Sequence, residues 1–299
     1  MQIGDLEVQL VSDGHVWVDP GGPFGLVPRV LYQRVIPPNP DNLVPEMLNC
    51  LLLRSGGRTL VVDTGLGSKL DERSLAQWRL ERPGGGLLEG LARLGVSPEQ
   101  VDVVICTHLH ADHCGGNTRR EGQGAVPAFP RAEYLVQRME WADASHPNVR
   151  TRATYSADNF SPVLAEGRLR LLHGDEQITP HVRCVMTPGH TRGHQSVLLS
   201  SGDWRGLFVS DMATFAVHMA RAAWVTSFDV EPLENITTKQ FWQRWALESD
   251  AWLFFIHDPL TPVARLVERG GRLETEPVEE ARELIDSLPT PPRLAGSVT

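Results

Sequence analysis

The sequence predicts an α/β fold in which several strands deliver polar side chains to the same edge of a sheet. Residues 87–94 have the apolar periodicity of a short helix, and residues 101–106 follow as an almost unbroken apolar strand. Histidine or aspartate comes shortly after three of the later apolar segments, at His190, Asp211 and His257. Separate loops at one sheet edge can therefore converge on one point.

The N-terminal part of the chain is predicted to contain strands and one long loop. Residues 6–10 alternate apolar and polar side chains, as in a half-buried strand, and residues 47–53 and 58–63 are typical of a hairpin. Between these elements, residues 13–45 are rich in proline and glycine, which disfavour long regular elements. We interpret this segment as a long ordered loop, either a lid over a functional site or a loop that packs on the rest of the domain.

The remaining segments continue the alternation of strands and helices. Further strands are expected at residues 134–136, 169–172, 181–186, 196–199, 207–209 and 252–256. A helix is expected from a cap at Thr237 or Thr238 to about Ser249. Its buried face is expected to carry Phe241, Trp242 and Trp245. We predict one domain over residues 1–288 and a flexible, proline-containing tail over residues 289–299.

Composition narrows the classes of partner. The net charge is −9 and no dense run of lysine and arginine occurs, so nucleic acid and anionic membrane surfaces are not expected partners. No segment is apolar over the length needed to cross a bilayer. Three of the four cysteines, Cys50, Cys106 and Cys184, lie in apolar segments, so we interpret them as reduced core thiols. This cysteine usage favours a cytoplasmic location.

The most informative segment follows the strand at residues 101–106. His108, His110, Asp112 and His113 lie within six residues, and a glycine pair begins at Gly115, two residues after His113. Imidazole and carboxylate are ligands that zinc and neighbouring divalent metals prefer, and a turn leaving a rigid strand can aim several of them at one point. Chance clustering of histidines is the alternative explanation, but four potential ligands at this spacing favour a metal site.

These residues resemble the His-x-His-x-Asp-His signature of the metallo-β-lactamase superfamily. Three later elements of that family are also matched in order: Pro188-Gly189-His190, the strand-end Asp211, and His257. Upstream, Asp63-Thr64-Gly65 is similar to the turn whose aspartate supports the site. The resemblance implies an α/β fold of four layers, an αββα sandwich of two mixed sheets flanked by helices.

The resemblance also implies two divalent metal ions and a ligand set for each. The first metal would be held by His108, His110 and His190, the second by Asp112, His113 and His257, and Asp211 would bridge them. Zinc is the first expectation, with manganese, iron or cobalt as alternatives. Two such ions share a hydroxide that acts as the nucleophile, and Asp112 is the expected catalytic residue that orients it.

Two further residues are expected to support the ligands, and one neighbour is not. Asp63 and His194 are candidates because a ligating imidazole normally donates its other N–H to an acceptor. Stabilisation of a turn is the alternative role for each. Cys114 follows His113 directly, but the resemblance implies a packing residue at this position.

Within the superfamily, residues 189–196 and the extended N-terminal segment are most similar to the branch that opens N-acyl homoserine lactone rings. We therefore expect a small-molecule lactone or ester as substrate, and the prediction allows for a homodimer. The well-known lactonases carry a tyrosine three residues after the bridging aspartate, where this chain has Thr214. Other expected pocket residues are Phe24, His218, Trp224 and Phe228.

Two other activities are compatible with the same set of residues. Phosphotriester hydrolysis, found among organophosphate-hydrolysing relatives, would use the same site. Iron-dependent oxidation chemistry also occurs on this fold, but those relatives replace or omit metal ligands. The complete set of seven ligands in this chain favours hydrolysis.

Overall fold

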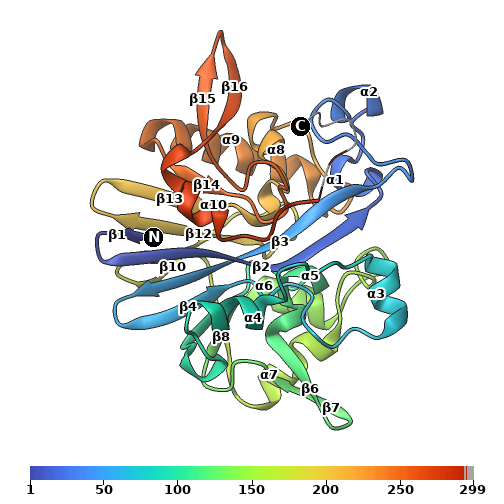
Figure 1. The fold of residues 1–299 in the computed structure, drawn as a ribbon, viewed down its shortest axis with the longest axis vertical. Helices are drawn as coiled ribbons and strands as arrows, with labels where there is room; N and C mark the ends of the chain where they lie inside the picture. Colours follow the sequence, from blue (N-terminus) through green and yellow to red (C-terminus); the bar gives the residue numbers. More distant parts are fainter. Residues whose placement is uncertain (293, 295–299) are drawn as a thin grey trace.

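The computed structural model describes residues 1–292 and 294, and within them two large mixed sheets face each other (Figure 1). The first sheet has strand order β1-β2-β3-β4-β5-β8-β9, with bounds Gln2–Ile3, Leu6–Val18, Val44–Ser55, Arg58–Val62, Val103–Ile105, Glu133–Gln137 and Leu169–Leu172. The second sheet runs in order from β10 to β16, with bounds Glu176–Thr179, Val182–Met186, Gln195–Ser201, Trp204–Phe208, Trp252–Phe254, Val263–Arg269 and Arg272–Pro277. A small hairpin is formed by β6 (Thr118–Glu121) and β7 (Gly124–Pro127).

Helices flank the two sheets. The α-helices α1 to α10 span Gly21–Phe24, Arg29–Tyr32, Glu72–Trp78, Leu87–Arg93, Ala111–Cys114, Arg138–Ser145, Ser161–Ala165, Ala216–Ala220, Pro232–Ser249 and Arg282–Asp286. Short 3-10 helices span Pro98–Gln100, Gly115–Asn117, Ala157–Asn159, Ser210–Met212 and Glu279–Ala281. In Figure 1, α3, α4, α6 and α7 lie on the side of the first sheet, and α8 and α9 lie on the side of the second.

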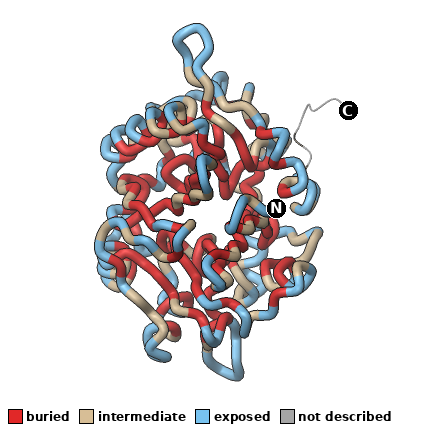
Figure 2. Tube along the Cα trace, turned by 90° about the vertical axis from the view of Figure 1, so that its left-hand side faces the viewer, coloured by how far each residue is buried: buried red, intermediate tan, exposed pale blue. Residues whose placement is uncertain are grey.

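The apolar side chains form three main layers of core. The central layer joins the inner faces of both sheets and includes Leu51, Ile105, Val197 and Phe254. A second layer lies between the first sheet and helices such as α4, and a third lies between the second sheet and α8 and α9. Figure 2 shows the buried residues concentrated inside the two halves, with exposed residues on the outer helices and at the projecting hairpin. This is the predicted four-layer αββα arrangement.

Strand direction places the carboxyl ends of the important strands at one edge. β4, β5 and β8 are parallel neighbours in the first sheet, and β13 and β14 are parallel in the second. β11 runs parallel to β13, because each is antiparallel to β12 between them. The loops after these strands therefore leave from the same edge of each sheet.

The predicted loop over residues 13–45 is wrong at its ends. β2 continues to Val18 and β3 begins at Val44, because these two strands stay paired to the Val18–Val44 register after a bulge near Gly14. Gly14 has a φ of 109°, a conformation that a glycine adopts without strain. The irregular part is thus limited to residues 19–43, which include α1 and α2.

The long helix α9 also begins earlier than predicted. It starts at Pro232, and proline is favoured in the first turn because the missing N–H has no partner there in any case. Of the three aromatic residues expected on its buried face, Trp242 is buried, Trp245 is half-buried and Phe241 is exposed. In the predicted tail, Pro289, Thr290 and Pro291 line a cavity against β3, and residues 293 and 295–299 lie outside the described part of the chain.

The helices show no candidate for a transmembrane segment among the described residues. All four cysteines are buried free thiols, as predicted for core positions.

Candidate metal centre

The loop after β5 carries four of the predicted ligands, and its backbone is held from three sides. The Thr107 N–H donates to Asp63 Oδ1 at 2.8 Å, the Leu109 N–H donates to Glu140 Oε1 at 2.9 Å, and the Ala111 N–H donates to the Thr154 carbonyl at 3.0 Å. These bonds fix the turn that leads from β5 into the short helix α5. The ligand side chains therefore leave a backbone that has little freedom to move.

The other three predicted ligands come from the second sheet. His190 follows β11, Asp211 lies in the 3-10 helix after β13, and His257 follows β14. The structure brings all seven side chains together, with ligand atoms within 4.8 Å of one another in three groups: His108, His110 and His190; His108, His113 and Asp211; Asp112, His113 and His257. The first and third groups coincide with the two sets expected from the sequence.

Asp211 lies at the centre of the cluster. One carboxylate oxygen, Oδ2, is 3.2 Å from His190 Nε2 and 3.3 Å from His113 Nε2. The other oxygen, Oδ1, is 3.3 Å from His257 Nε2. Asp211 therefore contacts members of both sets, as a bridging ligand must.

The two sheets are joined by hydrogen bonds at this edge. His257 Nδ1 donates to the Met47 carbonyl at 2.7 Å, and the Met47 N–H donates to the His257 carbonyl at 3.0 Å. On the other side of the cluster, the Gln195 N–H donates to the Thr107 carbonyl at 2.9 Å. Met47 lies in β3 and Gln195 in β12, whereas His257 follows β14 and Thr107 follows β5, so each bond links the first sheet to the second. The relative position of the two sheets therefore sets the geometry of the cluster.

Burial and mutual charge shift the ionisation of the cluster. Burial lowers the pKa of His108 and His110 well below the ordinary histidine value, so both rings are neutral. Burial also disfavours charge on His257, but Asp211 raises the pKa of His257 to about 9. Burial likewise disfavours the Asp211 carboxylate, but His257 and two other histidines hold its pKa well below its usual range. The carboxylate is therefore ionised and attracts protons or cations to the facing rings.

Hydrogen bonds at the outer ring nitrogens leave the inner nitrogens as acceptors. His113 Nδ1 donates to Asp63 Oδ2 at 3.0 Å, and His257 Nδ1 is occupied by the Met47 carbonyl. The Nε2 atoms of His113 and His257 then face each other at 3.2 Å. Two nitrogen lone pairs at this distance repel unless a proton or a metal ion lies against them. The tautomers of these rings therefore favour a cation between them.

Two further atoms of the cluster, His108 Nε2 and Asp211 Oδ1, are buried without a hydrogen bond among the described residues. A buried polar atom without a partner is costly, and such atoms in a native structure commonly mark a ligand site. Imidazole nitrogens and carboxylate oxygens are donors that suit zinc and related divalent ions. The residues present thus fit two divalent metal ions.

Asp63 supports this arrangement directly. Its backbone has a φ of 55°, which is uncommon for a residue other than glycine, and its carboxylate is fully buried. Both oxygens accept hydrogen bonds, from the Thr107 N–H and from the Thr107 hydroxyl and His113 Nδ1. The carboxylate thereby orients His113 and anchors the first residue of the ligand loop.

His194 lies near the cluster but does not hydrogen-bond to a ligand. Its ring centroid is 5.2 Å from that of His108, while its Nδ1 bonds to Thr187 at 2.8 Å. Burial lowers the pKa of His194 to about 3, so the ring is neutral. Cys114 is also turned away, because its thiol donates to the Leu109 carbonyl at 3.2 Å.

Two carboxylates near the ligands were not predicted. Asp229 Oδ1 accepts a hydrogen bond from His190 Nδ1 at 2.9 Å, and Glu140 accepts bonds from the Leu109 N–H and the Thr191 hydroxyl. Asp229 lies 39 residues after its partner, and no local spacing points to it. Because a ligating imidazole normally donates its other N–H to an acceptor, an acidic partner for His190 could be expected from the sequence. Which acidic residue it is depends on the fold.

A cavity of about 820 Å³ opens onto the cluster. The predicted Thr214 and Phe228 line it, together with Val18, Glu46, Gln77 and Trp78, which were not predicted. Trp78 and Gln77 come from α3 and its end, so the segment around α3 forms this wall, and the predicted loop contributes Val18 alone among its lining residues. Burial raises the pKa of Glu46 to about 7, against the opposing effect of His257.

Three of the predicted pocket residues are not among those that line this cavity. Phe24 is fully buried and stacks on Tyr32, with ring centroids 4.7 Å apart, and His218 and Trp224 lie around it at 5.4 and 6.2 Å. Apolar burial of several aromatic rings stabilises this cluster without a ligand. The structure thus places Phe24, His218 and Trp224 in a packed aromatic cluster and outside the lining of this cavity.

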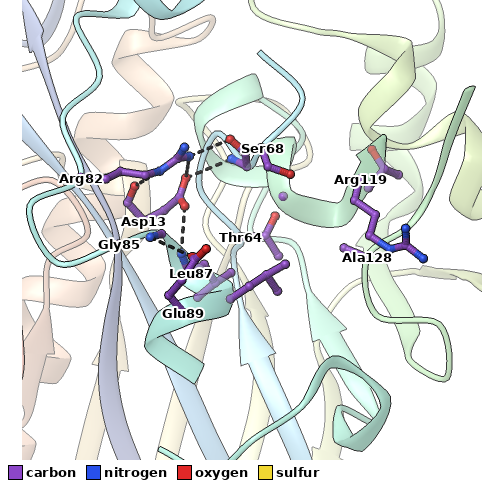
Figure 3. Close-up of a pocket in the computed structure, with 14 residues that line it drawn as sticks. Asp13, Thr64, Ser68, Arg82, Gly85, Leu87, Glu89, Arg119 and Ala128 are labelled. Carbon is purple, nitrogen blue, oxygen red and sulfur yellow. Dashed lines mark hydrogen bonds and ion pairs between the residues drawn. The ribbon is translucent and has the colours of Figure 1, made fainter. Parts of the chain in front are cut away.

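A second cavity, of about 670 Å³, is lined by residues that include Asp13, Thr64 and Arg82 (Figure 3). The polar atoms of its central carboxylate are occupied by the protein itself. Asp13 Oδ2 accepts from the Gly67 N–H and from Arg82 Nη2, and Asp13 Oδ1 accepts from the Leu87 N–H. The carboxylate in this cavity is therefore held by hydrogen bonds within the protein, whereas atoms of the histidine and aspartate cluster at the first cavity make none.

Comparison with known proteins agrees with the fold. A family model described as "Metallo-beta-lactamase superfamily" matches residues 43–229. An N-acyl homoserine lactonase from Bacillus cereus is 29% identical over 171 residues, which are 54% of this chain and 62% of that protein. The chain thus matches less than two thirds of the length of this relative.

Solved structures match over a larger share of the chain. A probable metal-dependent hydrolase from Staphylococcus aureus has a TM-score of 0.84 and 25% identity, over 93% of this chain and 99% of that one. AidC, a dizinc quorum-quenching lactonase in complex with a product, has a TM-score of 0.74 and 20% identity, over 93% and 96%. The latter likeness shows the fold alone. Because the family model covers more than half of the sequence, this chain belongs to the metallo-beta-lactamase superfamily.

Proposed function

We propose that this chain is a dinuclear metal-dependent hydrolase that opens lactone rings, with N-acyl homoserine lactones as the foremost substrate class. The observation that carries the proposal is the cluster of seven ligand side chains at the floor of an 820 Å³ cavity. The lactonase relatives support the choice of substrate class. Zinc is the proposed metal, since imidazole and carboxylate are ligands that it prefers, and manganese, iron and cobalt are the alternatives for this ligand set.

The proposed first set is His108, His110 and His190, the second is Asp112, His113 and His257, and Asp211 is shared. Two divalent ions bound there would activate water for attack and polarise the substrate carbonyl. Asp112 is suited to the proton transfers, because its side chain is 17% exposed and lines the cavity, whereas His113 beside it is fully buried. It would accept a proton from the attacking water and return it to the leaving alkoxide, giving the ring-opened hydroxy acid.

Phosphotriester hydrolysis is a second candidate, favoured by the lining of the cavity. Thr214 stands where the well-known lactonases have a tyrosine, and Trp78 and Phe228 give the wall aromatic surface. Aromatic surface suits an aryl leaving group, and a shorter hydroxyl at position 214 leaves room beside the metal centre. The same cluster would serve both reactions.

The test is metal content per chain, measured on protein purified without added metal, together with initial rates on an acyl homoserine lactone, an aryl phosphotriester, a β-lactam and a thioester. Two zinc ions per chain and fastest turnover of the lactone would support the first proposal. Fastest turnover of the phosphotriester would promote the second. A single iron ion and no hydrolysis of the four compounds would overturn both.

A further inference from the structure

Glu46 is the one carboxylate in the cavity wall outside the proposed metal ligands, and no other part of the proposed function uses it. It lies on β3 with 6% of its surface exposed and lines the cavity that opens onto the metal cluster. The next residue, Met47, accepts the hydrogen bond from His257 Nδ1. Glu46 is therefore placed beside the second proposed metal set.

The surroundings of Glu46 are apolar. Side chains alternate across a strand, so Glu46 shares a face of β3 with Leu48. Leu48 is fully buried in a cluster against which Val18 and Trp78 pack. Val18 and Trp78 also line the cavity, so Glu46 lies at the boundary between an apolar wall and the metal cluster.

Glu46 also has no protein partner. No hydrogen bond or ion pair connects its carboxyl group to another described residue, and the residues that line the cavity include neither lysine nor arginine. Glu46 as a whole is 6% exposed, and its carboxyl oxygens keep access to the cavity, where a donor on a bound molecule can reach them. The unused acceptor faces the space that a substrate would occupy.

We propose that Glu46 is a specificity-determining residue, whose carboxyl group accepts a hydrogen bond from a donor on the substrate close to the scissile carbonyl. This inference rests on the proposed function and narrows its substrate class to lactones that carry such a donor, as the amide N–H of an N-acylamino lactone does. Plain lactones lack the donor and leave the carboxyl group desolvated without a partner. Substrates with an anionic group at this position are repelled.

The test compares two ligands that differ in one group. The first is an N-hexanoylamino γ-butyrolactam, which resists ring hydrolysis, and the second is the same lactam with a CH₂ group in place of the side-chain amide N–H. Dissociation constants are measured by calorimetry for the metal-loaded wild type, Glu46→Leu and Glu46→Gln. The corresponding two lactones are used for initial rates, and metal content and circular dichroism are recorded for each protein.

A hydrogen bond to a charged acceptor corresponds to a preference of about 10- to 100-fold. We expect the wild type to bind the N–H lactam more tightly by this factor, Glu46→Leu to lose the preference, and Glu46→Gln to retain part of it. Metal content is expected to stay the same in all three proteins. An equal preference in wild type and Glu46→Leu overturns the inference, as does a loss of metal in Glu46→Leu that accounts for the change.

The lactone rates separate this inference from the proposed function. Hydrolysis of both lactones by the wild type, with no effect of Glu46→Leu on lactam preference, leaves the function in place and overturns the role of Glu46. A Glu46-dependent preference without hydrolysis of either lactone supports the role of Glu46 and overturns the hydrolytic function. If the wild type neither binds the lactams nor hydrolyses the lactones, both the role of Glu46 and the hydrolytic function are overturned.

Discussion

Two cavities of similar size lie in this molecule, one of about 820 Å³ over the metal cluster and one of about 670 Å³ around Asp13. In the second cavity, the Asp13 carboxylate is occupied by Arg82 and two backbone N–H groups. At the first, Asp211 Oδ1 and the neighbouring His108 Nε2 make no hydrogen bond among the described residues, and the Glu46 carboxyl group makes none either. The comparison teaches that cavities of similar volume can differ in whether their polar atoms are already occupied by the protein, and unoccupied atoms leave room for a ligand.

The largest effect is expected from Asp112→Asn in the first cavity. This change removes the group proposed to carry the proton and leaves its size unchanged, so turnover should fall by about 10²- to 10⁴-fold. Initial rates with the best of the four substrates give the measurement, and circular dichroism should match the wild type. Because Asp112 is also a proposed ligand of the second metal, rates are compared at equal metal content per chain. Wild-type turnover in the purified variant would contradict the role of Asp112.

The next effect concerns the carboxylates that orient the ligands. Asp63→Asn and Asp229→Asn each weaken the acceptor for one ligating imidazole, His113 or His190. Loss of such a partner typically weakens metal affinity by about 10- to 100-fold. Competition with a chelator of known affinity measures the change. Unchanged affinity in both variants would show that these carboxylates only stabilise the fold.

The pH dependence of metal affinity tests the ionisation of the cluster at the first cavity. Asp211 raises the pKa of His257 to about 9, so the metal-free chain holds a proton on this ring at neutral pH. A metal ion must displace that proton, and neighbouring carboxylates raise the pKa values of His113 and His190 as well. Metal affinity should therefore fall by at least about tenfold for each unit that the pH decreases below 9. Chelator titrations at pH 8, 7 and 6 test this slope. Constant affinity over this range would contradict a proton at the ligand position.

The smallest effect on activity is expected from Asp13→Asn in the second cavity. The ion pair with Arg82 is lost, and breaking a buried ion pair lowers the free energy of unfolding by about 3 kcal/mol. Urea denaturation measures this change. Turnover and metal content should remain at the wild-type level, and a large loss of turnover in a folded Asp13→Asn protein would break the distinction between the two cavities.

Much of the fold could be predicted because its signals are local. The apolar runs of β5, β9 and β11 to β14 indicate strands, and the glycine pair after residue 55 indicates a hairpin. Where pairing partners decide the outcome, prediction failed: β2 continues to Val18 because β3 pairs with it across a bulge, although the local sequence favours a loop. The helix α9 begins before the predicted cap because Pro232 occupies its first turn, where the missing N–H has no helical partner in any case.

The candidate site divides in the same way. The residues proposed as ligands were identifiable because four lie within six positions and the others follow recognisable strand ends. Asp229, Glu140 and Glu46 have no such spacing, and their positions depend on how the two sheets pack. Phe24 and Trp224 pack against each other outside the lining of the first cavity, and the sequence does not distinguish an aromatic side chain in a core from one in a pocket.

The hydrogen bonds that join Met47 to His257 and Gln195 to Thr107 have a consequence for how the molecule assembles. Four of the proposed ligands belong to the half of the chain that builds the first sheet, and three belong to the half that builds the second. Each proposed set combines ligands from both halves, so a metal ion bound at this edge would cross-link the two halves. Metal capture would then be a late event in folding, and chelation would loosen the contact between the two halves before it unravels either one.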